Sequence, residues 1–321
     1  MTYKTKLTVL SGIIAVLALV YTLSFVFDTD RINSRSAAYS WLDSKQAEEV
    51  TQITINSSEN KITLVQKNGG WFVVTDGSEY PARNLRVADF IRALAKKAPY
   101  PVISSNALSH ERLSLTGETQ VVVTGTGERT LLNLLVGAQD VSGHNVYLRR
   151  QDRDEIRCGE DIFSAYIYAN TNSWYNLLLF PESESGKLNV TSVQRLTVYP
   201  PATDAPSGEP LIFSRKNKMW FFNFDVVNPD MEKVDLYIRQ ILNASGDGFA
   251  DDTSFFSADY NDCSIVLELG DGSIKSLRMG PPVSDEDPHR YATVSGSNLV
   301  YSIPGWVIGR LFPDIPAFEK D

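Results

Sequence analysis

The side chains that bind metals or act as nucleophiles and bases are scarce in this sequence. Two cysteines and three histidines occur among 321 residues, and none of them belongs to a metal-binding or catalytic motif. His110, His144 and His289 lack the spacing of His-Glu-x-x-His, and the Gly-x-Ser-x-Gly motif is absent. We therefore predict no catalytic residue, no metal ligand and no cofactor-binding residue, and we expect a protein that is not an enzyme.

Cys158 and Cys263 are too few to form the disulfide framework of a small secreted domain. They also fall at non-equivalent places in the internal repeat described below. In an exported protein the two could still form a single bridge. The sequence leaves open whether they are bridged or free.

Basic residues are fewer than acidic ones, 30 against 39, which gives a net charge of −9 at pH 7. Proteins that bind nucleic acids neutralise phosphates with a basic face, so we expect no nucleic-acid partner. Acidic residues cluster at Asp251-Asp252, at Asp259 and Asp262, and at Asp285-Glu286-Asp287. These clusters lack the ligand pattern of a calcium loop, and we predict that they are solvated loops.

One long hydrophobic run is present, and it lies near the N-terminus. Leu7–Phe27 carries no charged residue and is long enough to cross a bilayer as a helix, which takes about 20 residues. Lys4 and Lys6 precede it, and two aspartates, Asp28 and Asp30, follow it. The positive-inside rule therefore predicts a cytoplasmic N-terminus and an extracytoplasmic body. A cleaved signal peptide is the alternative, but its apolar region is only about 7–15 residues long. We predict an uncleaved, single-pass anchor in the inner (cytoplasmic) membrane.

Comparison of the chain with itself reveals a long internal duplication. Most equivalent residues, such as Tyr147 and Tyr291, lie 143 or 144 positions apart. Trp71 and Trp220 are 149 positions apart because the Pro-, Gly- and Ser-rich stretch 200–210 lengthens the second copy. This period far exceeds the roughly 20–50 residues of a solenoid repeat and indicates a duplicated domain. We expect the two tryptophans to be buried at equivalent points.

The two copies have the same predicted order of elements. The first begins with a hairpin at Val50–Asn56 and Lys61–Lys67, followed by an aromatic strand at Trp71. A Tyr80-Pro81-Ala82 turn then leads into an amphipathic helix. The next two strands are joined at Gly125-Thr126-Gly127, which lacks the third glycine of a dinucleotide loop and is predicted to be a hairpin turn. The apolar stripes of the two amphipathic helices are predicted at Val87, Phe90, Ile91 and Leu94, and at Val234, Tyr237, Ile238 and Ile241.

Antiparallel strands with inserted helices predict an α+β fold, because nothing in the order of elements calls for a parallel sheet. The connection between the copies is apolar in its first half. We predict that this half packs onto a lobe, and a partner-facing patch is the alternative. The predicted segments are a membrane anchor (1–30), a first α+β repeat (31–168), an inter-repeat connection (169–192) and a second α+β repeat (193–321).

The order of these features resembles an uncharacterised bacterial family, the domain of unknown function number 4340. The resemblance is carried by the anchor, Trp71, Tyr80-Pro81-Ala82, the following helix, and Gly137 followed by Tyr147. The second copy departs from it at Asn228-Pro229-Asp230, where the Tyr-Pro-Ala sequence is lost. Members of the family are often encoded beside gliding-motility-type ABC transporter components. The resemblance therefore implies a cell-envelope protein associated with a transporter, and it supplies no catalytic residue.

We expect a non-enzymatic, membrane-anchored extracytoplasmic subunit or scaffold that assembles with membrane proteins, such as an ABC-type permease. The anchor, the duplicated body and the lack of a recognisable catalytic motif favour this role. Two other classes remain open. The protein could be an envelope module that binds a glycan or a peptide, or an anchored hydrolase whose catalytic groups meet only in the fold.

Overall fold

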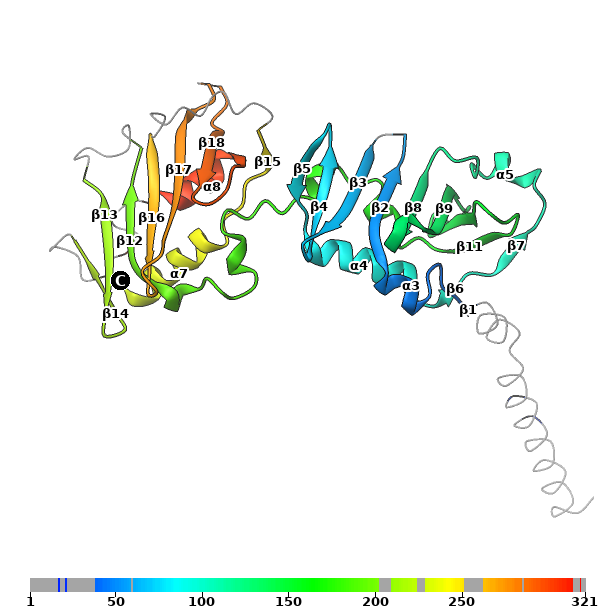
Figure 1. Ribbon diagram of the computed structural model, residues 1–321, viewed down its shortest axis with the longest axis horizontal. Coiled ribbons are helices and arrows are strands. Elements are labelled where there is room, and N and C mark those ends of the chain that lie inside the picture. The colour runs from blue at the N-terminus through cyan, green and yellow to red at the C-terminus, as the bar shows by residue number, and fades with distance from the viewer. Residues whose placement is uncertain are drawn as a thin grey trace, which may run out of the picture. The chain divides into compact units, whose positions relative to one another are not determined.

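The computed structural model describes residues 17, 21, 38–58, 60–201, 209–223, 229–250, 262–284, 286–313 and 318. These residues form mostly antiparallel β-sheet with few helices, in two compact units, Met1–Trp174 and Tyr175–Asp321 (Figure 1). The predicted anchor Leu7–Phe27 lies outside the described residues apart from Leu17 and Tyr21. None of the helices that the structure describes is long and apolar enough to cross a membrane.

The first unit contains a nine-stranded sheet. Its strands in chain order are β2 (Val50–Asn56), β3 (Lys61–Lys67), β4 (Gly70–Thr75), β5 (Ser78–Pro81), β7 (Val102–Ser104), β8 (Gln120–Gly125), β9 (Thr130–Gln139), β10 (Asn145–Arg150) and β11 (Ile156–Glu160). They lie side by side in the order β5-β4-β3-β2-β8-β9-β10-β11-β7. A separate pair joins β1 (Ala38–Tyr39) to β6 (Ala98–Pro99). The helices are α3 (Ser44–Glu48), α4 (Asn84–Ala95), α5 (Ser109–Arg112) and α6 (Ser164–Ile167).

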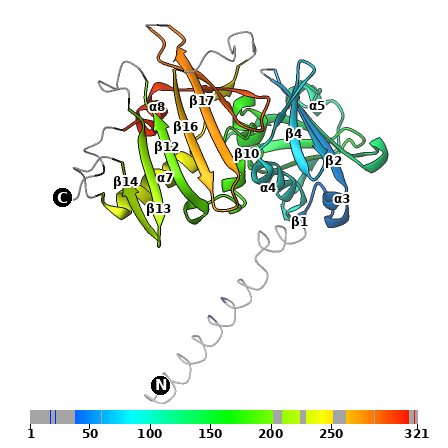
Figure 2. The same ribbon diagram turned by 60° about the vertical axis from the view of Figure 1, so that its left-hand side comes forward.

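The second unit contains an eight-stranded sheet. Its strands are β12 (Val193–Tyr199), β13 (Leu211–Lys216), β14 (Met219–Phe222), β15 (Gly248–Phe249), β16 (Cys263–Leu269), β17 (Ile274–Pro282), β18 (Arg290–Val294) and β19 (Val300–Ile303). They lie in the order β14-β13-β12-β16-β17-β18-β19-β15, and Figure 2 shows β12, β16 and β17 side by side. Two helices, α7 (Met231–Leu242) and α8 (Gly305–Leu311), share one apolar core with this sheet.

The two sheets have the same strand order, with β5 as an addition at one edge of the first. They also have the same irregularity. Gly137 and Ala138 of β9 together lie opposite Tyr147 of β10, and the same two-against-one pairing places Gly280-Pro281 opposite Tyr291. A β-bulge of this kind bends its strand and is a specific feature of a fold. The duplication seen in the sequence thus extends to strand order and to the position of a bulge.

Both amphipathic helices are confirmed, and each begins beside the tryptophan strand of its unit. The backbone N–H of Trp71 donates to Asn84 Oδ1 over 2.9 Å, and the N–H of Trp220 lies 3.2 Å from Met231 Sδ. Both partners are the first residue of their helix. Trp71 and Trp220 are buried, as predicted. The buried helix residues are Val87, Phe90 and Leu94 in α4, and Val234, Tyr237, Ile238, Ile241 and Leu242 in α7.

Each unit is closed by an aromatic residue from its C-terminal segment. The carbonyl oxygen of Trp174 accepts a 2.8 Å hydrogen bond from the N–H of Arg83, the N-cap of α4. The carbonyl oxygen of Phe318 accepts a 2.9 Å bond from the N–H of Asp230, the N-cap of α7. Both rings are buried, and they pack edge-on against aromatic residues at matching helix positions, namely Phe90 and Tyr237.

The prediction of a turn at Tyr80-Pro81-Ala82 is wrong. Tyr80 and Pro81 belong to the edge strand β5, where they pair with Val73 and Phe72 of β4. Proline has no backbone N–H to donate, and sheets therefore place it at an edge, where one side of the strand has no neighbour. The sequence signal that indicated a turn also fits such an edge strand.

The boundary between the two units falls inside the predicted connection 169–192, after Trp174. Its apolar half is packed. Tyr175, Leu177, Leu179 and Phe180 are buried in the second unit. The N–H of Leu179 donates to Ala244 over 2.9 Å. The aromatic residues of this segment are therefore core residues and not an exposed patch.

Candidate functional site

The histidines are distributed over both units. His110 lies in α5 and His144 lies just before β10, whereas His289 precedes β18 in the second unit. Among the described residues, no group of three His, Cys, Asp or Glu side chains is placed to hold a metal ion. The sequence contains no metal-binding motif, and the described part of the fold brings no such set of side chains together from distant positions.

His289 has two carboxylate partners. Its Nε2 lies 2.9 Å from Asp247 Oδ2, and its Nδ1 is hydrogen-bonded to Asp287. These bonds, with Asp287 first and Asp247 second, raise the pKa of His289 above its usual value. Both ring nitrogens thus face carboxylates, and when the ring is protonated each donates to one of them, which leaves no nitrogen directed at a nucleophile. The arrangement suits a tether between two loops better than a general base.

Asp262 also departs from the solvated loop that was predicted for it. Its carboxylate pairs with the buried guanidinium of Arg290, which in addition donates a 2.8 Å hydrogen bond to the carbonyl oxygen of Gly280. A buried arginine needs such partners because an unpaired buried charge is costly. The residues Asp251, Asp252, Asp259 and Asp285 lie outside the described part of the chain.

The two cysteines are free thiols that lie in different units. Cys263 is buried at the start of β16. Burial raises the pKa of Cys158, with the charge of Asp140 as a smaller cause. A raised pKa keeps the thiol protonated and lowers its reactivity as a nucleophile. Cys158 therefore lacks the environment of a catalytic thiol, whereas the Sγ of the buried Cys263 lies 4.0 Å from the guanidinium of Arg290.

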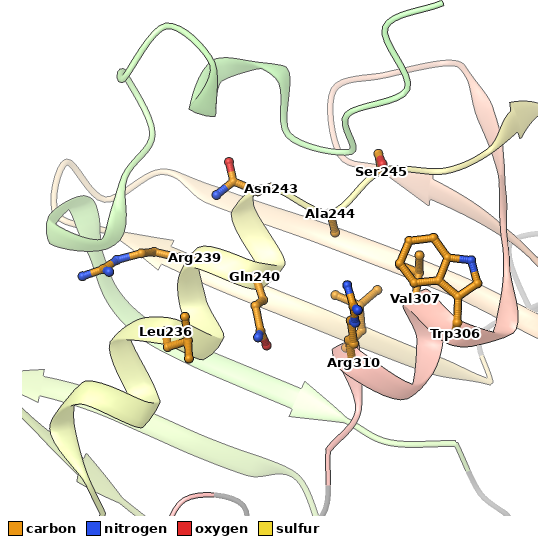
Figure 3. Close-up of a pocket in the computed structure, with 10 residues that line it drawn as sticks. Leu236, Arg239, Gln240, Asn243, Ala244, Ser245, Trp306, Val307 and Arg310 are labelled. Atoms are coloured by element: carbon orange, nitrogen blue, oxygen red, sulfur yellow. The ribbon is translucent and has the colours of Figure 1, made fainter. Parts of the chain in front are cut away.

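An open groove lies between α7 and α8 in the second unit. Its volume is about 310 Å³. Trp306 on α8 and Leu236 on α7 are 64% and 53% exposed. In Figure 3, Arg310 and Gln240 lie between the two helices, whereas Arg239 extends outward at the α7 rim. The residues that line the groove are Leu236, Arg239, Gln240, Asn243, Ala244, Ser245, Trp306, Val307, Arg310 and Leu311.

Helical spacing explains which side chains reach the groove. Leu236, Arg239, Gln240 and Asn243 are spaced i, i+3, i+4 and i+7 and therefore form one stripe along α7. This stripe lies beside the one that α7 buries in the core. On α8, the guanidinium of Arg310 lies 5.0 Å from the ring centre of Trp306, one turn earlier, in a cation–π contact.

The groove carries positive charge and no acidic lining residue, although the whole chain is acidic. Within the described residues, neither Arg239 nor Arg310 forms an ion pair. Arg92 occupies the position of Arg239 in the first unit, and there it pairs with Asp89 at i−3. The second unit has Leu236 in place of that aspartate. One substitution between the copies thus removes the acid and adds an exposed apolar side chain.

Sequence reasoning missed this groove, although a signal was available. The duplication aligns Trp306 with Ile162, a half-buried residue of the first unit. Trp306 lies on the surface of α8, whereas Ile162 lies just before α6. Together with the Asp-to-Leu change on the neighbouring helix, this difference marks a place where the copies differ in their surface and not in their core.

The fold defines a protein of two duplicated sheet-and-helix units, of which the second has an open groove beside the exposed Trp306. The chain matches the family described as "Domain of unknown function (DUF4340)" over residues 71–261, more than half of its length, and it belongs to that family. The matched region begins in β4 and ends just before β16, so it covers parts of both units and includes α7 but not α8. No curated protein and no solved structure matches this chain.

Proposed function

We propose that this protein is a membrane-anchored, extracytoplasmic assembly subunit that binds a membrane-protein partner, such as an ABC-type permease, through the groove between α7 and α8. The anchor is Leu7–Phe27, with the charge asymmetry that favours a cytoplasmic N-terminus. The proposed role is binding, without turnover of a substrate.

Exposed Trp306 and Leu236 beside Arg310 carry this proposal. Tryptophan and arginine are enriched among the residues that dominate the energy of protein–protein interfaces. An anchored chain also meets its partner at a raised effective concentration, which strengthens binding through a small groove. A hydrolase receives less support, because both nitrogens of His289 are occupied by carboxylates.

The test is purification of the full chain in mild detergent, with quantitative mass spectrometry of the proteins that accompany it. Leu236→Asp restores the acid found in the first unit and should pair with Arg239, so we expect the membrane partner to fall at least tenfold. Leu85→Asp is the matched control, because Leu85 is a 68% exposed leucine on α4. It should leave recovery of the partner unchanged.

Circular dichroism and a thermal melt of each variant show that the fold is intact. Recovery of the partner at the wild-type level with Leu236→Asp would contradict a docking role for the groove. Recovery of soluble proteins alone, with no membrane protein among them, would contradict the assembly role itself.

A further inference from the structure

Given the docking role proposed above, we infer that the groove between α7 and α8 binds a short acidic peptide segment of the partner. An apolar side chain of that segment lies against Trp306 and Leu236, and a carboxylate pairs with Arg310. A second carboxylate lies at the α7 rim, next to Arg239. Shape and charge each support this occupant.

The floor of the groove is apolar. Ala244, Val307 and Leu311 are buried beneath it, and the exposed faces of Trp306 and Leu236 form its sides. A volume of about 310 Å³ lies at the small end of the range for ligand pockets, roughly 300–1,000 Å³. This space suits one or two side chains of a peptide. An apolar anchor inserted between two helices is a common mode of peptide recognition.

The positive charge of the groove favours acidic residues on either side of the apolar residue of the peptide. Guanidinium groups bind carboxylates through paired hydrogen bonds, which give both strength and direction. Arg310 projects between the helices and has no acidic lining residue beside it. The chain as a whole is acidic and repels an acidic segment, whereas the positive charge of the groove attracts it.

The helix dipole explains only part of this arrangement. Arg239 and Arg310 lie in the last turns of α7 and α8, where a cation interacts favourably with the helix C-terminus. Arg92 lies in the last turn of α4 for the same reason, yet it is paired with Asp89. The dipole therefore accounts for arginine at these positions but not for the missing acid. An acid supplied by a partner restores the pairing.

A glycan fits the groove less well than a peptide does. Sugar hydroxyls donate as well as accept hydrogen bonds, and they need acceptors at the site. The only side-chain acceptors among the lining residues are those of Gln240, Asn243 and Ser245, with no carboxylate. Two guanidinium groups that only donate match an anionic group better than a neutral sugar.

The experiment is selection of a random 12-residue peptide display library on the full chain in detergent, with counter-selection on the Trp306→Ala and Leu236→Asp variants. We expect the retained sequences to contain Leu, Phe or Trp flanked by Asp or Glu. A labelled peptide from that pool should bind about tenfold more weakly to Arg310→Gln and about threefold more weakly to Arg239→Gln. The control Arg92→Gln should bind it as the wild type does.

Binding should also weaken as salt rises, because the Debye length falls below about 10 Å above 0.1 M. A control peptide with Gln in place of each acidic residue should bind the wild type weakly. Its affinity should be no higher than that of the acidic peptide for the Arg239→Gln, Arg310→Gln double variant. The inference that the bound segment is acidic would be contradicted by retained sequences without acidic residues. It would also be contradicted if the acidic peptide bound the double variant as tightly as the wild type. The docking role would still stand if Leu236→Asp releases the native partner.

Two further results would contradict the inference that the groove binds a peptide. One is a library from which no groove-dependent sequence is retained. The other is binding to a panel of immobilised oligosaccharides that disappears with Trp306→Ala, which would assign the groove to a glycan. Retention of the native partner by Leu236→Asp would instead remove the docking role on which the peptide depends.

Discussion

Gly137 lies in the bulge of β9 at a point where a side chain has no room. A Cβ atom at this position would lie 2.2 Å from the carbonyl oxygen of Leu113, a backbone atom. The N–H of the next residue, Ala138, donates to that same oxygen over 3.0 Å. The close approach explains why the pattern of Gly137 followed by Tyr147 is informative, since the glycine permits the bulge and the tyrosine lies opposite it.

Gly137→Ala should lower the free energy of unfolding by about 1–3 kcal/mol, since the backbone must shift to relieve the clash. Gly309→Ala is the contrasting control, because Gly309 lies in α8 with no atom within 4 Å of the added methyl group. It should raise stability by about 0.5–1 kcal/mol. Urea denaturation of both variants measures the difference, and equal effects would contradict this account of the bulge.

We expect the stability of the second unit to depend on pH through His289. Its pKa is raised by hydrogen bonds to Asp287 and Asp247, so its contribution to stability is complete below its ordinary pKa of 6.5. That contribution is lost as the pH rises through the raised pKa. Hydrogen bonds from the backbone and ring of His289 lower the pKa of Asp287 from 3.8, so its contribution is complete above pH 3.8. The tether is therefore strongest between these two values.

We expect the melting temperature to fall between pH 6 and pH 8 by more in the wild type than in His289→Gln. Glutamine retains hydrogen-bonding capacity but does not titrate in this range. An NMR titration of the His289 ring should give a pKa above 6.5. A value below 6.5, or equal pH profiles for the two proteins, would show that the carboxylates do not hold the ring.

At the scale of the element, α4 and α7 depend on the aromatic residue that closes each unit. Trp174→Ala should destabilise the first unit by about 3–5 kcal/mol, the usual cost of removing a fully buried aromatic side chain. Hydrogen-exchange mass spectrometry should show faster exchange in α4, because Phe90 loses its contact with the indole ring, and unchanged exchange in α7. Trp306→Ala is the control. Trp306 is exposed, so its replacement should alter hydrogen exchange in neither α4 nor α7.

The sequence predicted the long elements well and the short ones poorly. The apolar stripes of α4 and α7 repeat over three turns, which is enough to define a helix. The edge strand β5 was mistaken for a turn because Pro81 is compatible with both. The tether of His289 was missed because Asp247 is 42 residues away in the chain. The groove needs both α7 and α8, and no local pattern reports which exposed faces meet.

At the scale of the whole molecule, the proposed topology rests on Leu7–Phe27 and its flanking charges. A reporter that is active only outside the cytoplasm should work when fused after Asp321. A protease added to cells stripped of their outer layers should degrade the body of the protein. Protection of the body under these conditions would contradict the topology.

Replacement of Leu7–Phe27 by a cleavable signal should leave the two units folded but abolish assembly at native abundance. Tethering raises the effective concentration of the groove next to its membrane partner, and release of the body removes this advantage. Co-purification of the partner measures the effect. A released body that assembles as well as the anchored protein would show that the tether is dispensable.

The position of Trp174 has a consequence for synthesis on the ribosome. This residue ends the first unit, and the next residue, Tyr175, already belongs to the second. The N-terminus of α4 lacks its closing partner until residue 174 has left the exit tunnel, by which time the rest of the first unit has been made. Domains fold as units during synthesis. We therefore expect the first unit to reach its native state late and in one step, and a nascent chain released just short of Trp174 to remain open to proteolysis.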